Sequence, residues 1–334
     1  MKSFIWVAIV AVVGWFLKRM LKRFLDKTVG KHVDAFADAL FEAAYKQMQE
    51  YLKNHTPAEV IMKADENDPG AQFNLGNMYC FGEGVSQNYS EAGKWYRKAA
   101  EHGLADAQYN LALMYYNGYG VQQDYSEAVK WYKNAAEQGH AEAQNNLGGM
   151  YFNGDGVQQD YSEAVKLFRK AAGHGITEAQ NNLGIMYYNG DGVQQDKSEA
   201  VNWFMKAAEN GHAKAQHNLA SMYYNGDGVQ QDKPEALKWY RKAAEQEYAP
   251  AQYNLALMYY NGDEVQQDKF EAVNWFRKAA EHGLANAQYN LGVMYFNGEE
   301  VKQDKSEAVN WYKKAAEQGN TDAQQALKKL NETW

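Results

Sequence analysis

The stretch that decides the fold runs from Ala71 to Asp106 and reads AQFNLGNMYCFGEGVSQNYSEAGKWYRKAAEHGLAD. It recurs seven times at a spacing of 36 residues, without an insertion or a deletion. A fixed period in this range indicates a solenoid, in which each unit buries its apolar face only by stacking on its neighbours. The seven copies cover residues 71–106, 107–142, 143–178, 179–214, 215–250, 251–286 and 287–322.

Each copy divides into two amphipathic helices, named helix A and helix B. Helix A is clearest in AQYNLALMYYNG of the second copy, where Leu111, Met114 and Tyr115 lie on one face. The Asn-Gly pair ends this helix, because glycine adopts the left-handed conformation without steric cost. Helix B begins at Asp124, and Glu127 three residues later predicts a capping box at its first turn. The corresponding predicted N-caps of the later copies are Asp160, Asp196, Asp232, Asp268 and Asp304.

The repeat resembles the Sel1-like repeat family, a longer relative of the tetratricopeptide repeat. The resemblance rests on A-x-x-x-L-[GA]-x-x-Y-x-x-G-x-G-V in helix A and its loop, and on E-A-x-x-W-[YF]-x-K-A-A-x-x-G in helix B. It covers residues 71–334 and implies an all-α, right-handed superhelix of seven helix pairs. Departures from the pattern are local: Glu264 and Glu300 at the second loop glycine, Leu167 at the helix B tryptophan, Asn134 at the helix B lysine, and Glu247 at a closing glycine.

Shorter helical segments flank the repeats. Residues 32–70 contain a predicted helix over residues 33–52 and a degenerate helix B with the sequence TPAEVIMKAD. Residues 323–334 contain a lone helix A, with Lys328 and Lys329 on its outer side. Because an exposed terminal repeat would leave its apolar face in water, both segments are predicted to cap the solenoid.

The amino-terminal segment, residues 1–31, differs from everything after it. Residues 4–17 are an uncharged apolar run, which as a helix would be about 21 Å long against the roughly 30 Å hydrocarbon core of a bilayer. Three interpretations compete: a cleaved signal peptide, a membrane anchor lengthened by snorkelling Lys18 and Arg19, and a buried helix. The basic residues that follow, and the lack of a small-residue cleavage pattern, favour an anchor with membrane contact through residues 4–25.

Charge sets the expected orientation and excludes one class of partner. Residues 1–31 hold seven of the 34 Lys and Arg and one of the 42 Asp and Glu, a net charge of +6. The remainder therefore has 27 basic and 41 acidic residues, a net charge of −14. Since basic flanks stay in the cytoplasm, we expect cytoplasmic repeats, with a secreted or periplasmic location after signal cleavage as the alternative. The acidic remainder lacks the positive footprint that nucleic acid binding requires.

The sequence offers no catalytic or metal-binding constellation. Of the eight histidines, His102, His174 and His282 lie at helix ends, and His212 and His217 lack a third ligand at zinc-like spacing. The single cysteine, Cys80, occupies an aromatic position of the repeat. The G-x-G pairs follow a helix and lack a P-loop lysine, and the V-Q-Q-D loops carry too few carboxylates for calcium. We therefore expect no cofactor, no metal ion and no enzymatic activity.

Comparison of the copies separates constant from variable positions of helix A. The third, seventh and tenth residues vary, and their spacing of four and three places them on one helical face. They are aromatic, small or amide residues, with an asparagine beside the tenth, a composition that recognition surfaces favour. By resemblance to tetratricopeptide repeats, this face lines a concave groove for a protein or peptide partner. The predicted groove residues are Tyr109, Leu113, Tyr116, Asn145, Phe152, Asn153, Asn181, Ile185, Tyr188, Asn189, His217, Tyr224, Asn225, Tyr253, Leu257, Tyr260, Tyr289 and Phe296.

These features predict a membrane-tethered, non-enzymatic scaffold for protein–protein interaction. We expect an extended ligand held by tyrosines at both ends of the groove, Tyr109 and Tyr116 at one and Tyr253, Tyr260 and Tyr289 at the other. One alternative is a secreted or periplasmic protein that acts in host interaction or in the cell envelope. A remote one is a hydrolase of cell-wall or β-lactam substrates, as suggested for cysteine-rich relatives, but the chain lacks their disulfides and a visible nucleophile–base pair.

Overall fold

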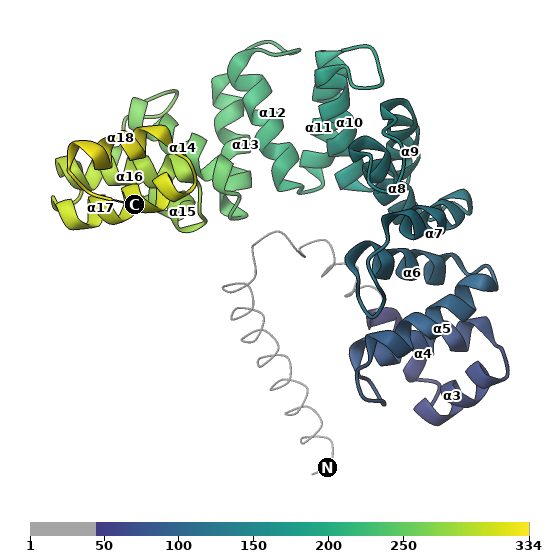
Figure 1. Cartoon of the computed structure of the whole chain (residues 1–334). Coiled ribbons are helices and arrows are strands. Elements are labelled where there is room, and N and C mark those ends of the chain that lie inside the picture. The colour runs from purple at the N-terminus through teal and green to yellow at the C-terminus, as the bar shows by residue number, and fades with distance from the viewer. Residues whose placement is uncertain (1–44, 334) are drawn as a thin grey trace. The chain divides into compact units, whose positions relative to one another are not determined.

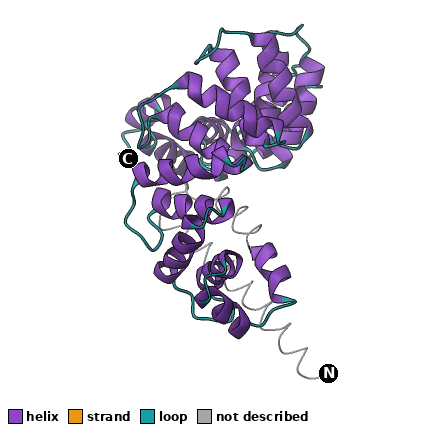
Figure 2. Cartoon of the chain, turned by 90° about the vertical axis from the view of Figure 1, so that its right-hand side faces the viewer, coloured by secondary structure: helices purple, strands orange, loops and turns teal. Residues whose placement is uncertain are grey.

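The computed structural model describes residues 45–333, and every regular element in this range is a helix (Figures 1 and 2). The chain divides into two compact units between His102 and Gly103. The predicted anchor over residues 4–25 and most of the helix predicted over residues 33–52 lie outside the described residues. Within residues 45–333, no helix is both long enough and apolar enough to span a bilayer.

The first unit contains part of the segment that was predicted to cap the repeats, residues 32–70. Its TPAEVIMKAD segment is helical, as expected, and Thr56 opens it with a complete capping box. The Thr56 hydroxyl accepts a hydrogen bond from the Glu59 amide, and the Glu59 carboxylate accepts one from the Thr56 amide at 2.7 Å. The helices of this unit within the described range are residues 45–52, α3 (Pro57–Asp65), α4 (Pro69–Phe81) and α5 (Tyr89–Glu101).

The second unit is an α-solenoid, because each helix packs on the helices directly before and after it in sequence. Helices A and B alternate along it, and a lone helix A, α18, ends it with Lys328 and Lys329 exposed. Its helices are α6 (Ala105–Asn117), α7 (Tyr125–Glu137), α8 (Ala141–Asn153), α9 (Tyr161–Gly173), α10 (Thr177–Asn189), α11 (Lys197–Glu209), α12 (Ala213–Asn225), α13 (Lys233–Glu245), α14 (Ala249–Asn261), α15 (Lys269–Glu281), α16 (Ala285–Asn297), α17 (Lys305–Glu317) and α18 (Thr321–Lys329).

Helices A and B of one repeat pack closely because a small residue of helix A faces an aromatic ring of helix B. A Cβ atom added to Gly184 of α10 would lie 2.6 Å from the Phe204 ring of α11. Three other repeats of this unit place alanine at the same position, and all three side chains are fully buried: Ala112, Ala220 and Ala256. The L-[GA] pair of the repeat is therefore the contact that sets the distance between the two helices.

The six predicted aspartate caps of helix B are confirmed. Each Oδ1 accepts a hydrogen bond from the amide three residues later at 2.9–3.0 Å. The capping box expected at Asp124 is only half formed, because the Glu127 carboxylate pairs with Lys130 instead. Because Glu127 pairs with Lys130, its carboxylate does not bond the amide of the N-cap residue. The hydrogen bond from the Glu127 amide to Asp124 remains. The capping residues are Asp124, Asp160, Asp196, Asp232, Asp268 and Asp304.

The second loop glycine lies against the start of helix B in the preceding repeat. At Gly192 φ is +68°, and an added Cβ atom would lie 2.4 Å from the carbonyl carbon of Tyr161. At the next boundary the Ser198 hydroxyl donates a hydrogen bond to the Gly228 carbonyl at 3.0 Å. Where glutamate replaces this glycine, the serine 30 residues earlier is replaced as well, by Pro234 before Glu264 and by Phe270 before Glu300. The two positions therefore change together along the chain.

Candidate interaction surface

The third residue of helix A lies nearer the interior than the sequence suggested. Tyr109, Asn145 and Asn181 are only 4%, 5% and 2% exposed. The Tyr109 ring packs on the Tyr132 ring of α7, with centroids 5.8 Å apart. The Asn181 side chain accepts a hydrogen bond from Asn218 of the next repeat at 3.2 Å. These three predicted groove residues therefore form part of the packing between helices and contribute little exposed surface.

The other predicted residues are partly or fully exposed. Six of them are aromatic residues at the tenth position of helix A, and three are the asparagines beside it, whose side chains are exposed. The remaining six lie at the third or the seventh position of helix A. These residues are Leu113, Tyr116, Phe152, Asn153, Ile185, Tyr188, Asn189, His217, Tyr224, Asn225, Tyr253, Leu257, Tyr260, Tyr289 and Phe296.

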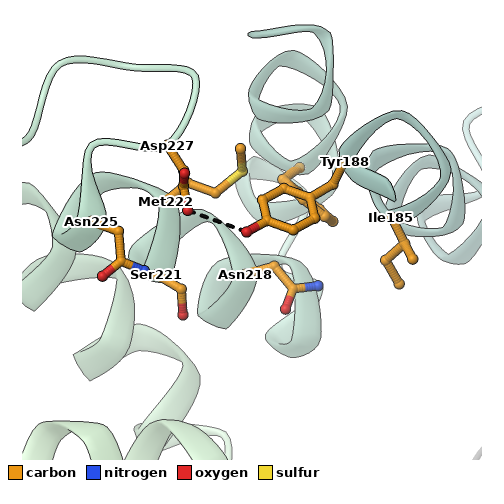
Figure 3. Close-up of a pocket in the computed structure, with 8 residues that line it drawn as sticks. Ile185, Tyr188, Asn218, Ser221, Met222, Asn225 and Asp227 are labelled. Atoms are coloured by element: carbon orange, nitrogen blue, oxygen red, sulfur yellow. Dashed lines mark hydrogen bonds between the residues drawn. The ribbon is translucent and has the colours of Figure 1, made fainter. Parts of the chain in front are cut away.

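A hollow of about 200 Å³ opens on this face where α10 and α11 meet α12 (Figure 3). It brings together three predicted residues, Ile185, Tyr188 and Asn225, and two that the sequence analysis did not select, Asn218 and Asp227. The remaining lining residues are Phe204, Ser221 and Met222. Small-molecule sites usually measure roughly 300–1,000 Å³, so this hollow has the size for one side chain and not for a cofactor.

Three tyrosine hydroxyls at the tenth position, those of Tyr188, Tyr224 and Tyr260, are bonded within the chain. Tyr188 donates to the Asp227 carboxylate at 3.2 Å, and Lys197 donates to the same carboxylate at 2.5 Å. The lysine also lies 5.0 Å from the centre of the Tyr188 ring. Each tyrosine–acid–lysine group joins one repeat to the loop of the next, and we call it a boundary cluster. The three boundary clusters are Tyr188–Asp227–Lys197, Tyr224–Asp263–Lys233 and Tyr260–Glu299–Lys269.

Earlier boundaries of the second unit use a different contact. There helix B begins with tyrosine instead of lysine, and its ring packs on the aromatic residue at the tenth position. The centroids of Tyr116 and Tyr125 are 5.1 Å apart, and those of Phe152 and Tyr161 are 5.2 Å apart. The change from tyrosine to lysine at the first residue of helix B therefore divides the second unit into an aromatic half and a charged half.

A family model described as the Sel1 repeat matches seven consecutive 36-residue segments, which begin two residues before the copies defined above. The chain belongs to the Sel1 repeat family. The matched segments are residues 69–104, 105–140, 141–176, 177–212, 213–248, 249–284 and 285–320. Sel1 repeats form scaffolds typical of protein–protein interaction.

Two solved Sel1-repeat structures are similar to the chain. One is a protective antigen of uropathogenic Escherichia coli, with 41% identity and a TM-score of 0.75 over 83% of this chain, which spans 59% of that protein. The other is a Sel1 repeat protein from Oxalobacter formigenes, with 34% identity and a TM-score of 0.71 over 89% of this chain and 91% of that one. A comparison with curated proteins found no match.

The boundary clusters of these Sel1 repeats were missed because each cluster joins residues 30 and 39 positions apart. The signal was nevertheless present, since Lys197, Lys233 and Lys269 each precede a loop acid by 30 residues. Within residues 45–333, no group of three or more histidine, cysteine or carboxylate side chains is placed to hold a metal ion.

Two histidines form the N-caps of Sel1-repeat A helices beside this surface. His140 Nδ1 accepts the Ala143 amide at 3.2 Å, and its ring stacks on Tyr109 with centroids 4.5 Å apart. His212 Nδ1 accepts an amide in the same way, and its Nε2 donates to the Glu178 carboxylate at 2.7 Å. This arrangement requires the tautomer with its hydrogen on Nε2, because a protonated Nδ1 would face an amide N–H. Burial lowers the pKa of His140, and the hydrogen bond from His212 lowers the pKa of Glu178.

Lowering the pH from 7.5 to 5.5 is expected to destabilise the fold through His140, by at most about 1.4 kcal/mol, the value of one pH unit below the unfolded pKa. Its pKa in the folded chain is lower than in the unfolded chain, where it is about 6.5. The unfolded state therefore takes up the proton first, so the stability that is present above pH 6.5 declines as the pH falls below it. The measurement is urea unfolding at a series of pH values.

His140→Asn provides the matched control for the pH series. Asn320 holds the same place before α18, where its Oδ1 accepts the Ala323 amide at 2.9 Å. The variant should keep the cap. Its free energy of unfolding should change less between pH 7.5 and 5.5 than that of the parent chain, by the amount assigned to His140. An unchanged slope between pH 7.5 and 5.5 would contradict the assignment to His140.

Proposed function

We propose that the chain is a non-enzymatic scaffold that holds an extended segment of a partner protein across the helix A face of its second unit. The observation that carries the proposal is the hollow between α10 and α12, which has the volume of one side chain. Buried Phe204 and Met222 supply apolar lining. Asn218, Ser221 and Asn225 supply polar groups to the same hollow (Figure 3). A site with these properties fits one side chain of a peptide whose remaining residues lie along the neighbouring helices.

The partner is expected to be uncharged where it contacts this face. The only carboxylate that lines the hollow is Asp227, and it is bonded to Lys197 and Tyr188. The Lys197 hydrogen bond, followed by that of Tyr188, holds the Asp227 pKa below its ordinary value, so this carboxylate remains charged and paired. A charged ligand side chain would lose its water without gaining an unpaired partner charge.

Filling the hollow tests this function. A display library of random sixteen-residue peptides is selected on the full chain, and the enriched peptides are then titrated against Ser221→Leu. Leucine already occupies this repeat position at Leu113 and Leu257, so the helix accepts it, while its larger side chain occupies the hollow. We expect affinity to fall at least about tenfold, as at a central anchor of an interface.

Gly149→Leu is the control, since it makes a leucine at the same repeat position of α8, outside the hollow and with no atom within 4 Å of the new Cβ. It should change affinity less than about twofold, within the range of neutral interface positions. The scaffold proposal fails if no peptide is enriched, or if both leucine variants bind like the parent chain. Turnover of a cell-wall or β-lactam substrate, abolished by one side-chain change, would favour the hydrolase alternative.

We also propose that residues 4–25 attach the chain to a membrane, with the repeats on the cytoplasmic side. The support is the uncharged run over residues 4–17 and the net charge of +6 in residues 1–31. Ile9→Lys with Val12→Lys should move the chain from the membrane fraction to the soluble fraction, because each buried lysine costs roughly 2.5–3.5 kcal/mol. Lysines at the exposed loop residues Gln122 and Gln158 are the control. A secreted form lacking the apolar run would support signal cleavage instead.

A further inference from the structure

The asparagine that ends helix A is bonded in one half of the second unit and free in the other. Asn117 Nδ2 donates to the Leu113 carbonyl at 3.0 Å, Asn153 Nδ2 to the Asp155 carboxylate at 3.1 Å, and Asn189 Nδ2 to Asp191 at 3.0 Å. Within the described residues, the exposed side chains at the three later positions make no hydrogen bond. These positions are Asn225, Asn261 and Asn297.

The boundary clusters explain this division. Asp155 and Asp191 follow an aromatic boundary, so each remains available to the asparagine two residues before it. At the later boundaries, tyrosine and lysine occupy the equivalent carboxylate, as Tyr224 and Lys233 do at Asp263, at 2.7 and 3.0 Å. The acid is then no longer available to the asparagine beside it. Where helix B starts with lysine, the asparagine at the end of the next helix A therefore keeps its side-chain amide unbonded within the described chain.

These side-chain amides have the chemistry of a peptide group. Each carboxamide offers a donor and an acceptor, the same pair that an extended backbone presents at each residue. Asn225 lies at the wall of the hollow, with its amide on the same side as Ser221 (Figure 3). Asn261 and Asn297 occupy the same position of the next two A helices, α14 and α16. Adjacent packed helices have axes about 8–10 Å apart, so the two helices of one repeat advance the stack by at most about 20 Å. An extended segment covers this distance with about six residues at about 3.3 Å each.

The charges around these asparagines also point to one class of ligand. The loop acids beside them, Asp227, Asp263 and Glu299, are each paired with a lysine of the preceding repeat. The seventh positions between them, Ser221, Leu257 and Val293, carry no charge. The charges of these three acids are therefore balanced, and an uncharged segment loses the least solvation beside them.

We propose that Asn225, Asn261 and Asn297 form a ladder that hydrogen-bonds the backbone of an extended, uncharged partner segment running across α12, α14 and α16. This inference rests on the proposed function and assigns the contact to the charged half of the second unit. The hollow takes one side chain at the α12 end, and the ladder fixes the backbone beyond it. The earlier asparagines, which are bonded within the chain, take no part.

The test uses the sixteen-residue peptides enriched on the full chain, made synthetically and titrated against single alanine variants. Asn225→Ala, Asn261→Ala and Asn297→Ala are each expected to weaken binding roughly five- to tenfold, the effect of losing one or two backbone hydrogen bonds. The matched controls Asn153→Ala and Asn189→Ala should change affinity less than twofold. Peptides with an N-methyl group at the contacted amide should lose affinity for the parent chain and little for the alanine variant at that position.

The outcomes separate the ladder from the function on which it rests. If Ser221→Leu abolishes binding and the three ladder variants bind like the parent chain, the ladder is wrong and the scaffold function stands. Equal losses at the control asparagines, or enriched peptides dominated by charged residues, also overturn the ladder. If no peptide is enriched, both proposals fail. Circular dichroism melting of each variant confirms that the folded chain is compared throughout.

Discussion

Replacing Phe168 with alanine is expected to lower the free energy of unfolding by about 4 kcal/mol, the usual cost of emptying a buried phenylalanine site. The Phe168 ring is 2% exposed and lies in a cluster with Ala164, Val165, Leu183 and Met186. Its edge would lie 2.9 Å from a Cβ atom added to Gly148, so α8 and α9 pack directly through this ring. Because repeats are stabilised by their neighbours, the chemical unfolding transition should also broaden as the stack loses cooperativity.

Phe270→Ala removes the same side chain from an exposed site and is the control. Phe270 lies in the first turn of α15 and is 62% exposed, so its loss should change stability by no more than about 0.5 kcal/mol. Guanidinium unfolding followed by far-ultraviolet circular dichroism measures both variants. Similar losses from the two substitutions would contradict the assignment of Phe168 to the core.

The second large effect is expected at Gly192, where alanine should cost about 3 kcal/mol. Its φ of +68° costs an L-residue roughly 1–2 kcal/mol, and the new Cβ atom must displace backbone atoms of Tyr161 from a distance of 2.4 Å. Moving a packed loop by this amount adds roughly 1–3 kcal/mol. The loss should appear as a lower midpoint in urea unfolding.

Gly175→Ala separates the two contributions. Gly175 has a φ of +88° but no atom within 4 Å of an added Cβ, so only the backbone cost of about 1–2 kcal/mol applies. The difference between the variants then measures the contact between one loop and the preceding helix B. Equal losses would show that the close approach at Gly192 relaxes without cost.

Most of the architecture could be predicted because the same two-helix pattern occurs seven times in the sequence. The helix pairs, the glycine ends of helix A and the aspartate caps such as Asp160 follow from local chemistry, and the structure confirms them. Glu127 was assigned to a capping box and pairs with Lys130, since two local partners competed for one carboxylate. Sequence alone does not rank such competing contacts.

The interaction surface was harder to predict because variability has two causes. The third residue of helix A changes between copies, which suggested a free surface, yet Asn181 and His217 are matched by Asn218 and Asn254 of the following repeats. The partner is the fourth-position asparagine in both pairs, so the third residue can change between copies and still be bonded within the stack. The tenth-position tyrosines were expected to contact a partner, but Tyr188, for example, bonds Asp227 through its hydroxyl. Contacts 30 to 39 residues apart require the stacking geometry, which a single sequence does not contain.

A crystal structure of the chain bound to the tightest selected peptide tests the central claim most directly. The scaffold account predicts an extended peptide on the helix A face of the second unit, with one side chain in the hollow between Ile185 and Asn225. Its backbone should meet the side chains of Asn261 and Asn297. A peptide bound to the helix B face, near Lys166 and Lys238, or bound with the hollow empty, would contradict the account.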